Sequence, residues 1–182
     1  MTVYRNLSAP TPATAPAKKY VGAGVILVRD ADGENTPRVL LLLGRETGVW
    51  SFSKGHPEEE DRGSPLRTAV RETLEETGYE VGRDYQLIGD ALRFGKRPYW
   101  VGVVGHEAPP VRLADREHSA AGWFTAEEAT LLNTNIDVRA WIKKALAGCP
   151  TAGWTRIIAS LSRPVNVSNV CRRLTAQAGI VT

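Results

Sequence analysis

The run Arg71 to Gly78 (R-E-T-L-E-E-T-G) carries the clearest chemical signal in this 182-residue chain. Glu72, Glu75 and Glu76 have the spacing i, i+3 and i+4, which places three carboxylates on one side of a helix. Arg71 can reach Glu75 one turn later, but Glu72 and Glu76 have no basic residue at helical spacing. A divalent cation such as Mg²⁺, which prefers oxygen ligands, would remove their repulsion. A solvated acidic face has the same spacing, so the spacing leaves both interpretations open.

The helix that must position these carboxylates is predicted to begin at Ser64-Pro65 and to end at Gly78. Serine is a favoured N-cap, proline is favoured at the first helical position, and glycine is favoured just past the last. The carboxylates are expected to lie opposite an apolar stripe that packs on the core. This stripe consists of Leu66, Val70, Thr73 or Leu74, and Thr77.

The loop before the helix reads W50-S-F-S-K-G-H-P-E58. Loop and helix together resemble the box of the Nudix hydrolase family, in which a glycine and an acidic loop precede R-E-x-x-E-E-x-G. The resemblance covers roughly residues 20–147. It implies an α+β fold, an α/β/α sandwich around a mixed β-sheet, and an enzyme that hydrolyses phosphoric anhydride bonds.

The resemblance also implies roles for individual residues. Arg71 would orient a carboxylate, and one of the helix glutamates would help to activate water. Lys54 and His56 would bind substrate, with Lys54 meeting a phosphate as a point charge. The metal is expected to be Mg²⁺, with Mn²⁺ as an alternative, and its implied ligands are Glu72, Glu75, Glu76 and the carbonyl of Gly55.

The loop departs from the family pattern in length. Fifteen residues separate Gly55 from Arg71, two more than the family usually has. The family's loop glutamate falls on Gly63 when counted back from Arg71, and on Asp61 when counted forward from Gly55. We therefore expect a two-residue insertion, with Asp61 or Glu60 taking the role of the missing carboxylate.

Two segments resemble one subfamily, the asymmetric diadenosine tetraphosphate hydrolases. The first is the loop at 50–58, which resembles W-x-x-P-K-G-H-x-E but has Ser53 where proline is frequent. The second is R-E-H-S-A-A-G-W at 116–123, followed by E-E-A at 127–129. This resemblance implies that Glu117 is a further metal ligand or general base. The alternative is that Glu117 and His118 form an ordinary surface pair.

A basic and aromatic segment, R-F-G-K-R-P-Y at 93–99, lies between two predicted strands. Arg93, Lys96 and Arg97 are candidates for binding phosphates, and Phe94 or Tyr99 for stacking on a base. A basic hairpin whose aromatic residues belong to the core fits the same pattern. The tryptophans at 50, 123 and 141 are expected to lie in the core.

The remaining elements are predicted from apolar and β-branched runs and from helix caps. Strands are expected at 20–28, 38–43, 86–92, 100–106 and 122–125, with the first two forming a hairpin. Residues 50–52 are expected to be extended and 55–63 irregular, and further helices are expected at 126–132, 136–147 and 168–178. The expected organisation is a flexible leader over 1–18, a Nudix domain over 19–149 and a basic C-terminal extension over 150–182, helical and packed on the domain.

Composition and charge narrow the class of protein. No apolar run approaches the roughly 20 residues of a membrane-spanning helix, and the N-terminus lacks the apolar core of a secretory signal. Cys149 and Cys171 have no metal-ligand spacing and are expected to be free thiols, which favours a reducing, cytoplasmic location. The net charge is +3, but the chain from Val138 onward holds seven basic and no acidic residues. Such an end suits a polyanion, although it also fits ordinary exposed charge.

The sequence thus favours an Mg²⁺-dependent pyrophosphohydrolase that cleaves a nucleoside diphosphate linked to another moiety. Diadenosine tetraphosphate or a related nucleoside polyphosphate is the preferred substrate. Decapping of mRNA, RNA 5′ pyrophosphohydrolysis or diphosphoinositol polyphosphate hydrolysis are alternatives, with RNA bound through the basic C-terminal region. A Nudix fold that binds a nucleotide or RNA without turnover is a further alternative, and the oligomeric state is left open.

Overall fold

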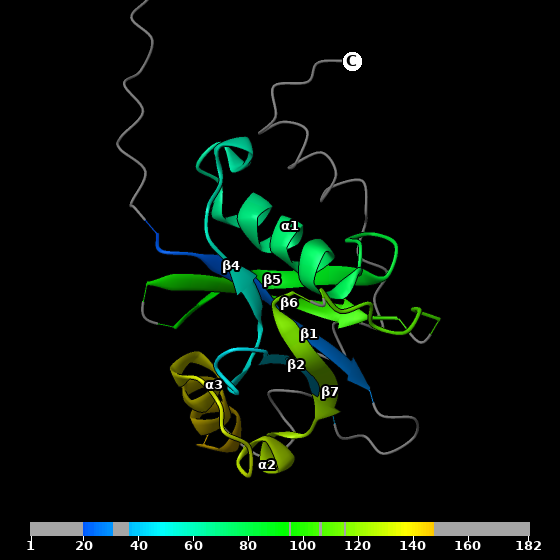
Figure 1. Cartoon of the computed structure of the whole chain (residues 1–182), viewed down its shortest axis with the longest axis vertical. Helices are drawn as coiled ribbons and strands as arrows, with labels where there is room; N and C mark the ends of the chain where they lie inside the picture. The colour runs from blue at the N-terminus through cyan, green and yellow to red at the C-terminus, as the bar shows by residue number, and fades with distance from the viewer. Residues whose placement is uncertain (1–19, 31–36, 95, 106, 115, 148–182) are drawn as a thin grey trace, which may run out of the picture.

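The computed structural model describes residues 20–30, 37–94, 96–105, 107–114 and 116–147. The predicted leader, the helix at 168–178, the basic extension and both cysteines lie outside the described residues. Figure 1 shows three layers, in which a β-sheet separates helix α1 from helices α2 and α3. The predicted α/β/α sandwich is therefore confirmed. Within the described part of the chain, no helix is long and apolar enough to span a membrane.

The elements follow one another in a mixed order of strands and helices. The first half holds β1 (Ala23–Asp30), β2 (Pro37–Gly44), β3 (Trp50–Ser51), β4 (Ser53–Gly55), a 3₁₀ turn η1 (Glu59–Asp61) and α1 (Pro65–Thr77). The second half holds β5 (Tyr85–Phe94), β6 (Arg97–Val104), β7 (His118–Phe124), α2 (Ala126–Ala129) and α3 (Ile136–Ala147). The helix predicted at 136–147 is confirmed at both ends, whereas β7 begins four residues before its predicted start.

The sheet has the order β3-β2-β1-β6-β5, with β4 paired to β1 and β7 paired to β2. Strands β1 and β6 run parallel, and the other pairings are antiparallel. One edge of β1 is shared, since Ala23 pairs with Gly55 of β4 while Val28 pairs with Val39 of β2. This division brings β4, and the loop that follows it, beside α1.

Side chains of β1 alternate between two cores, as the pleat of a strand requires. Ala23, Val25 and Leu27 belong to the core beneath α1, whereas Ile26 and Val28 belong to the core beneath α3. Because both faces of this strand are covered, its sequence reads as a continuous apolar run.

The predicted apolar stripe of α1 is confirmed at Thr73 and Thr77 but is wrong at its leucines and valine, which are not fully buried. Leu74 is 46% exposed, and the buried residues of the helix are Thr68, Ala69, Thr73, Glu76 and Thr77. Thr73 and Thr77 donate their hydroxyl hydrogens to the carbonyls one turn earlier, at 2.7 and 2.6 Å, which satisfies these groups inside the core. Small and hydroxyl side chains allow α1 to pack closely on β1 and β4. One of the three glutamates therefore lies on the buried face, not opposite it.

Candidate active site

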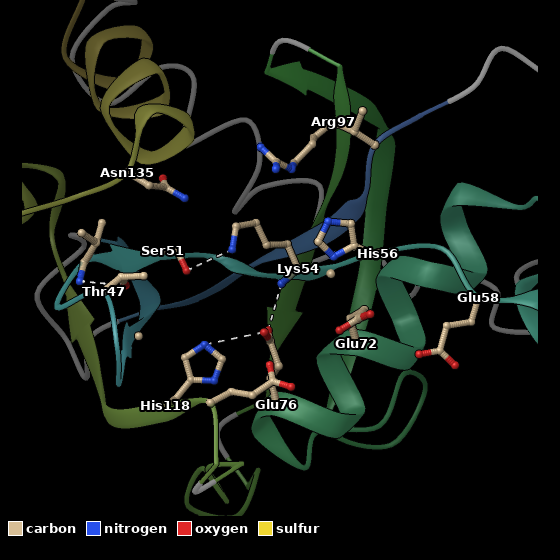
Figure 2. Close-up of a pocket in the computed structure, with 15 residues that line it drawn as sticks. Thr47, Ser51, Lys54, His56, Glu58, Glu72, Glu76, Arg97, His118 and Asn135 are labelled. Atoms are coloured by element: carbon tan, nitrogen blue, oxygen red, sulfur yellow. Dashed lines mark hydrogen bonds and ion pairs between the residues drawn. The ribbon is translucent and has the colours of Figure 1, made fainter.

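A cleft of about 620 Å³ opens between α1, β4, the start of β7 and the start of α3. Helix α1 contributes Glu72 and Glu76, and β4 contributes Lys54 and Gly55. Figure 2 shows these side chains converging from different elements on a common space. The wall formed by α1 and the loop before β7 is acidic, and the opposite wall is basic.

Glu76 lies deepest in the acidic wall and is 4% exposed. Its Oε2 accepts a hydrogen bond from the main-chain nitrogen of Lys54 at 2.9 Å, and its Oε1 lies 3.6 Å from Nε2 of His118. Burial raises the pKa of Glu76 to about 7, although Ser53 and Lys54 act in the opposite direction. The carboxylate is thus fixed by the backbone while its charge is incompletely compensated, as expected for a cation site.

Glu72 lies one turn earlier and packs directly on β4. A Cβ atom on Gly55 would lie 2.0–2.1 Å from the Glu72 carboxylate, so any larger residue would displace this carboxylate from its present position. The Nη2 of Arg71 is 3.0 Å from Oε1 of Glu72. Burial raises the pKa of Glu72, and the charge of Arg71 counteracts this rise.

Arg71 connects α1 to the long loop through Asp61. The two Asp61 oxygens accept hydrogen bonds from Nε and Nη2 of Arg71 at 3.3 and 3.1 Å. Asp61 is 2% exposed and also accepts from the Thr68 hydroxyl at 2.7 Å and from the Glu58 amide at 2.9 Å. Glu60 is exposed and no closer than 3.8 Å to Arg71. Of the two candidate carboxylates in the lengthened loop, Asp61 is therefore the one that holds Arg71.

Glu75 is placed differently from the other two helix glutamates. Its side chain is 54% exposed and pairs with Nη1 of Arg71 at 2.9 Å, as the i, i+4 spacing predicted. The described residues that line the cleft include Glu72 and Glu76 but not Glu75. The structure therefore brings two of the three predicted carboxylates together on α1.

The loop before β7 contributes a further acidic side chain to the cleft, that of Glu117. Ligand atoms of Glu76, Glu117 and His118 all lie within 4.8 Å of one another, close enough to hold one metal ion. His118 is buried although Glu117 is exposed, so the surface-pair alternative is wrong for His118, and burial lowers the pKa of this histidine. A neutral imidazole beside carboxylate oxygens is a suitable donor set for a divalent cation.

The basic wall faces this cluster across the cleft (Figure 2). Lys54 places its Nζ 3.4 Å from Oγ of Ser51, which holds the ammonium group on the β3–β4 side. Arg97, from the start of β6, and His56 also line the cleft. Cations opposite a group of carboxylates suit a phosphate chain that is bound at one end by metal and at the other by side chains.

Part of the predicted set of substrate-binding residues is wrong. Phe94 and Tyr99 are 5% and 0% exposed and pack edge-on at 5.7 Å between ring centroids, so neither can stack on a base. Arg93 and Lys96 are exposed and are not among the described residues that line the cleft. Of the basic residues at 93–99, only Arg97 reaches it, and the basic hairpin with core aromatics is the correct interpretation.

Sequence reasoning missed Asn135, which lines the cleft from the start of α3. It is brought there by main-chain pairing with β3, in which the Trp50 nitrogen donates to the Asn133 carbonyl and the Asn135 nitrogen donates to the Trp50 carbonyl. Its Oδ1 accepts from the Val138 amide at 2.9 Å, as a helix cap does. Only the capping role had a signal in the sequence, because the pairing joins segments some 80 residues apart.

Known proteins with a similar sequence point to one family. The model of the NUDIX domain matches residues 18–145. The asymmetrical bis(5′-nucleosyl)-tetraphosphatase of Sus scrofa is 33% identical over 121 residues, which cover 61% of this chain and 80% of the relative. A peroxisomal coenzyme A diphosphatase of Caenorhabditis elegans is 35% identical over 99 residues, or 52% of this chain and 40% of the relative.

Among solved structures, the binary complex of a C. elegans Ap4A hydrolase has a TM-score of 0.57. It is 20% identical and covers 71% of this chain and 96% of its own, a similarity that concerns the fold. The extent of the NUDIX match, together with the glutamate-bearing helix beneath a K-G-H loop, establishes the family. The chain belongs to the Nudix family of hydrolases that cleave pyrophosphate bonds.

Proposed function

We propose that this hydrolase cleaves diadenosine tetraphosphate asymmetrically, releasing ATP and AMP, with Mg²⁺ as its cofactor. The observation that carries the proposal is the cleft with a carboxylate cluster on one wall and Lys54 and Arg97 on the other. The relative named an asymmetrical bis(5′-nucleosyl)-tetraphosphatase supports the choice of substrate. A polyphosphate bridge is long and highly charged. It suits a cleft that has carboxylates on one wall and cations on the other.

Glu72, Glu76, Glu117 and the carbonyl of Gly55 are the proposed metal ligands, with Glu75 joining them by exchanging its contact with Arg71. Bound Mg²⁺ would neutralise charge on the phosphates and make a bound water more acidic. The side chains of the protein orient these components. The Lys54 side chain binds a phosphate oxygen, and the main-chain nitrogen of the same residue donates a hydrogen bond to Glu76. One residue therefore positions both the substrate and the carboxylate.

The coenzyme A diphosphatase relative supports a second candidate substrate, coenzyme A, whose pyrophosphate could occupy the same acidic wall. This relative has only 40% of its length matched, against 80% for the tetraphosphatase, so we prefer the dinucleotide. Capped RNA, 5′-triphosphate RNA and diphosphoinositol phosphates remain outcomes of the test.

The test is product analysis on a panel of diadenosine tetraphosphate, coenzyme A, capped RNA, 5′-triphosphate RNA and a diphosphoinositol phosphate, with Mg²⁺ and with a chelator. We expect ATP plus AMP, in the presence of Mg²⁺ only. Release of another product with higher kcat/KM would overturn the choice of substrate. Ligand binding without any product would support a binding module instead. The Glu76→Gln variant serves as the inactive control.

A further inference from the structure

Asp137, in the first turn of α3, is a buried carboxylate that the proposed reaction does not use. It is 4% exposed and lies behind the basic wall. Its Oδ2 accepts a hydrogen bond from the Tyr99 hydroxyl at 2.7 Å and lies 3.4 Å from Nη1 of Arg97. Removing a carboxylate from water is costly, so a buried one requires partners of this kind.

The position of Asp137 is fixed both by the start of its own helix and by Tyr99. Its helix begins at a cap, in which Asn135 binds the Val138 amide, and the N-terminal end of a helix favours a negative charge. Burial and the neighbouring Asp137 charge raise the pKa of Tyr99 far above its usual value, so the phenol remains protonated and donates. The aromatic ring is held by Phe52 and Phe94, which pack edge-on against it.

Arg97 has the longest side chain of this group and is the one that reaches the cleft. The Arg97 side chain is 33% exposed. Its guanidinium lies near Asp137 on one side and borders the open cleft on the other. In Figure 2, Arg97 and Glu76 lie on opposite sides of Lys54. A long arginine side chain loses rotamer freedom when it binds a ligand, and this cost is smaller if the free protein already holds it in place.

We propose that Asp137 and Tyr99 are positioning residues that hold Arg97 as a second phosphate contact, beyond Lys54, on the side of the cleft away from the carboxylates. The proposal rests on the proposed function, because it assigns Arg97 to the distal phosphates of the same substrate. With Arg97 in this role, the basic wall favours substrates with a long phosphate chain. A tetraphosphate bridge reaches both cations, whereas a diphosphate reaches only the one nearer the metal.

The test measures kcat and KM for diadenosine tetraphosphate in Asp137→Asn, Tyr99→Phe and Arg97→Gln. We expect KM to rise about tenfold in Arg97→Gln, about fivefold in Asp137→Asn and about twofold in Tyr99→Phe, with kcat retained. Arg83→Gln, which also removes one cation but at a residue that does not line the cleft, should leave KM unchanged. Unchanged KM in Asp137→Asn would overturn the proposal.

A double-mutant cycle separates positioning from a general structural role. In the Arg97→Gln background, Asp137→Asn should cause no further rise in KM, since the residue that it positions is absent. An equal rise in both backgrounds would mean that Asp137 acts on the fold and would reject the proposal. If Asp137→Asn does not fold, the same double-mutant cycle is measured with Tyr99→Phe, which keeps the ring in the core. The same outcomes then support or reject the proposal.

A binding measurement distinguishes failure of this proposal from failure of the proposed function. Inorganic tripolyphosphate is titrated into the full chain by calorimetry, with Mg²⁺ present. Loss of affinity in Asp137→Asn that depends on Arg97 supports the positioning role even if diadenosine tetraphosphate is not a substrate. Turnover of diadenosine tetraphosphate, with tripolyphosphate affinity and KM both unaffected by Asp137→Asn, would reject the positioning role and keep the function.

Discussion

The two walls of the cleft are supported in different ways. On the acidic wall, the buried Glu76 is bonded to the β4 backbone, and Glu72 packs against Gly55 with no space for a Cβ atom. On the basic wall, Lys54 and Arg97 reach into the cleft on long side chains, and the Arg97 guanidinium lies 3.4 Å from Asp137. The acidic wall has a main-chain contact and close packing in addition to its ion pairs, whereas the contacts that hold the basic wall are polar contacts between side chains.

This difference suggests a division of labour. Groups that act on the reacting bond must be placed to within a fraction of an ångström, which main-chain contacts and close packing provide. Groups that recognise a charged and flexible ligand can adjust. Substitutions in the acidic wall are therefore expected to lower kcat, and substitutions in the basic wall to raise KM. The following variants test this division, from the largest expected effect to the smallest.

Glu76→Gln should have the largest effect. The amide keeps the size of the side chain and an oxygen that can accept from the Lys54 amide, but it removes the charge that a divalent cation needs. We expect kcat to fall about 10³-fold with little change in melting temperature. Steady-state rates across a Mg²⁺ titration measure the loss. Glu59→Gln, at an exposed position of η1, is the matched control. Wild-type kcat in the Glu76 variant would show that the acidic wall does not act on the reacting bond.

Gly55→Ala tests whether close packing alone matters. The added methyl group would overlap the Glu72 carboxylate, so that this carboxylate must move by a substantial part of an ångström from its place in the cleft. Since a displacement of this size can cost about 10²-fold in rate, we expect kcat to fall by that order while KM changes little. Gly105→Ala is the control, because its Cβ would meet nothing closer than 3.9 Å. A rise in KM without loss of kcat would break the division between the walls.

The acidic wall was more predictable from sequence than the basic wall, for a physical reason. Glu72, Glu76 and Arg71 lie within two turns of one helix, where spacing fixes their relative directions. The loop count also identified Asp61, along with Glu60, as a candidate for the missing loop carboxylate, although it did not predict the contact with Arg71. The sequence offered Arg97 only as one of three basic candidates, and strand pairing between distant segments decides that it reaches the cleft; Asn135 comes there through such pairing too and had no local signal as a cleft residue.

The incorrect predictions share this origin. Tyr99 was a candidate for base stacking because its segment is basic and aromatic, but strand alternation turns the ring into the core. The stripe of α1 was placed on Leu66, Val70, Thr73 or Leu74, and Thr77, but only the two threonines are buried, with their hydroxyls bonded to the preceding turn. In both cases the tertiary environment decides which side chains are buried, and the types of residue in the segment did not indicate it correctly.

Asp61→Asn should have the smallest effect on rate and a clear effect on stability, because Asp61 touches Arg71 and not the reacting groups. Burial tends to raise the pKa of Asp61, but hydrogen bonds from Arg71, the Glu58 amide and Thr68 outweigh it and leave the pKa below the ordinary 3.8. The folded state thus favours the ionised form, which stabilises the fold above pH 3.8 and is lost as pH falls through the lower folded value.

At pH 7 the variant should be less stable by about 1–3 kcal/mol. Urea unfolding at pH 7 and near pH 3 measures the difference, which should narrow at the lower pH because there the unfolded state binds a proton that the ionised carboxylate of the folded state does not. A difference that stays constant between the two pH values would mean that the charge of Asp61 does not stabilise the loop. A large fall in kcat at pH 7 without loss of stability would mean that the lengthened loop contributes directly to catalysis, and would place Asp61 within the acidic wall itself.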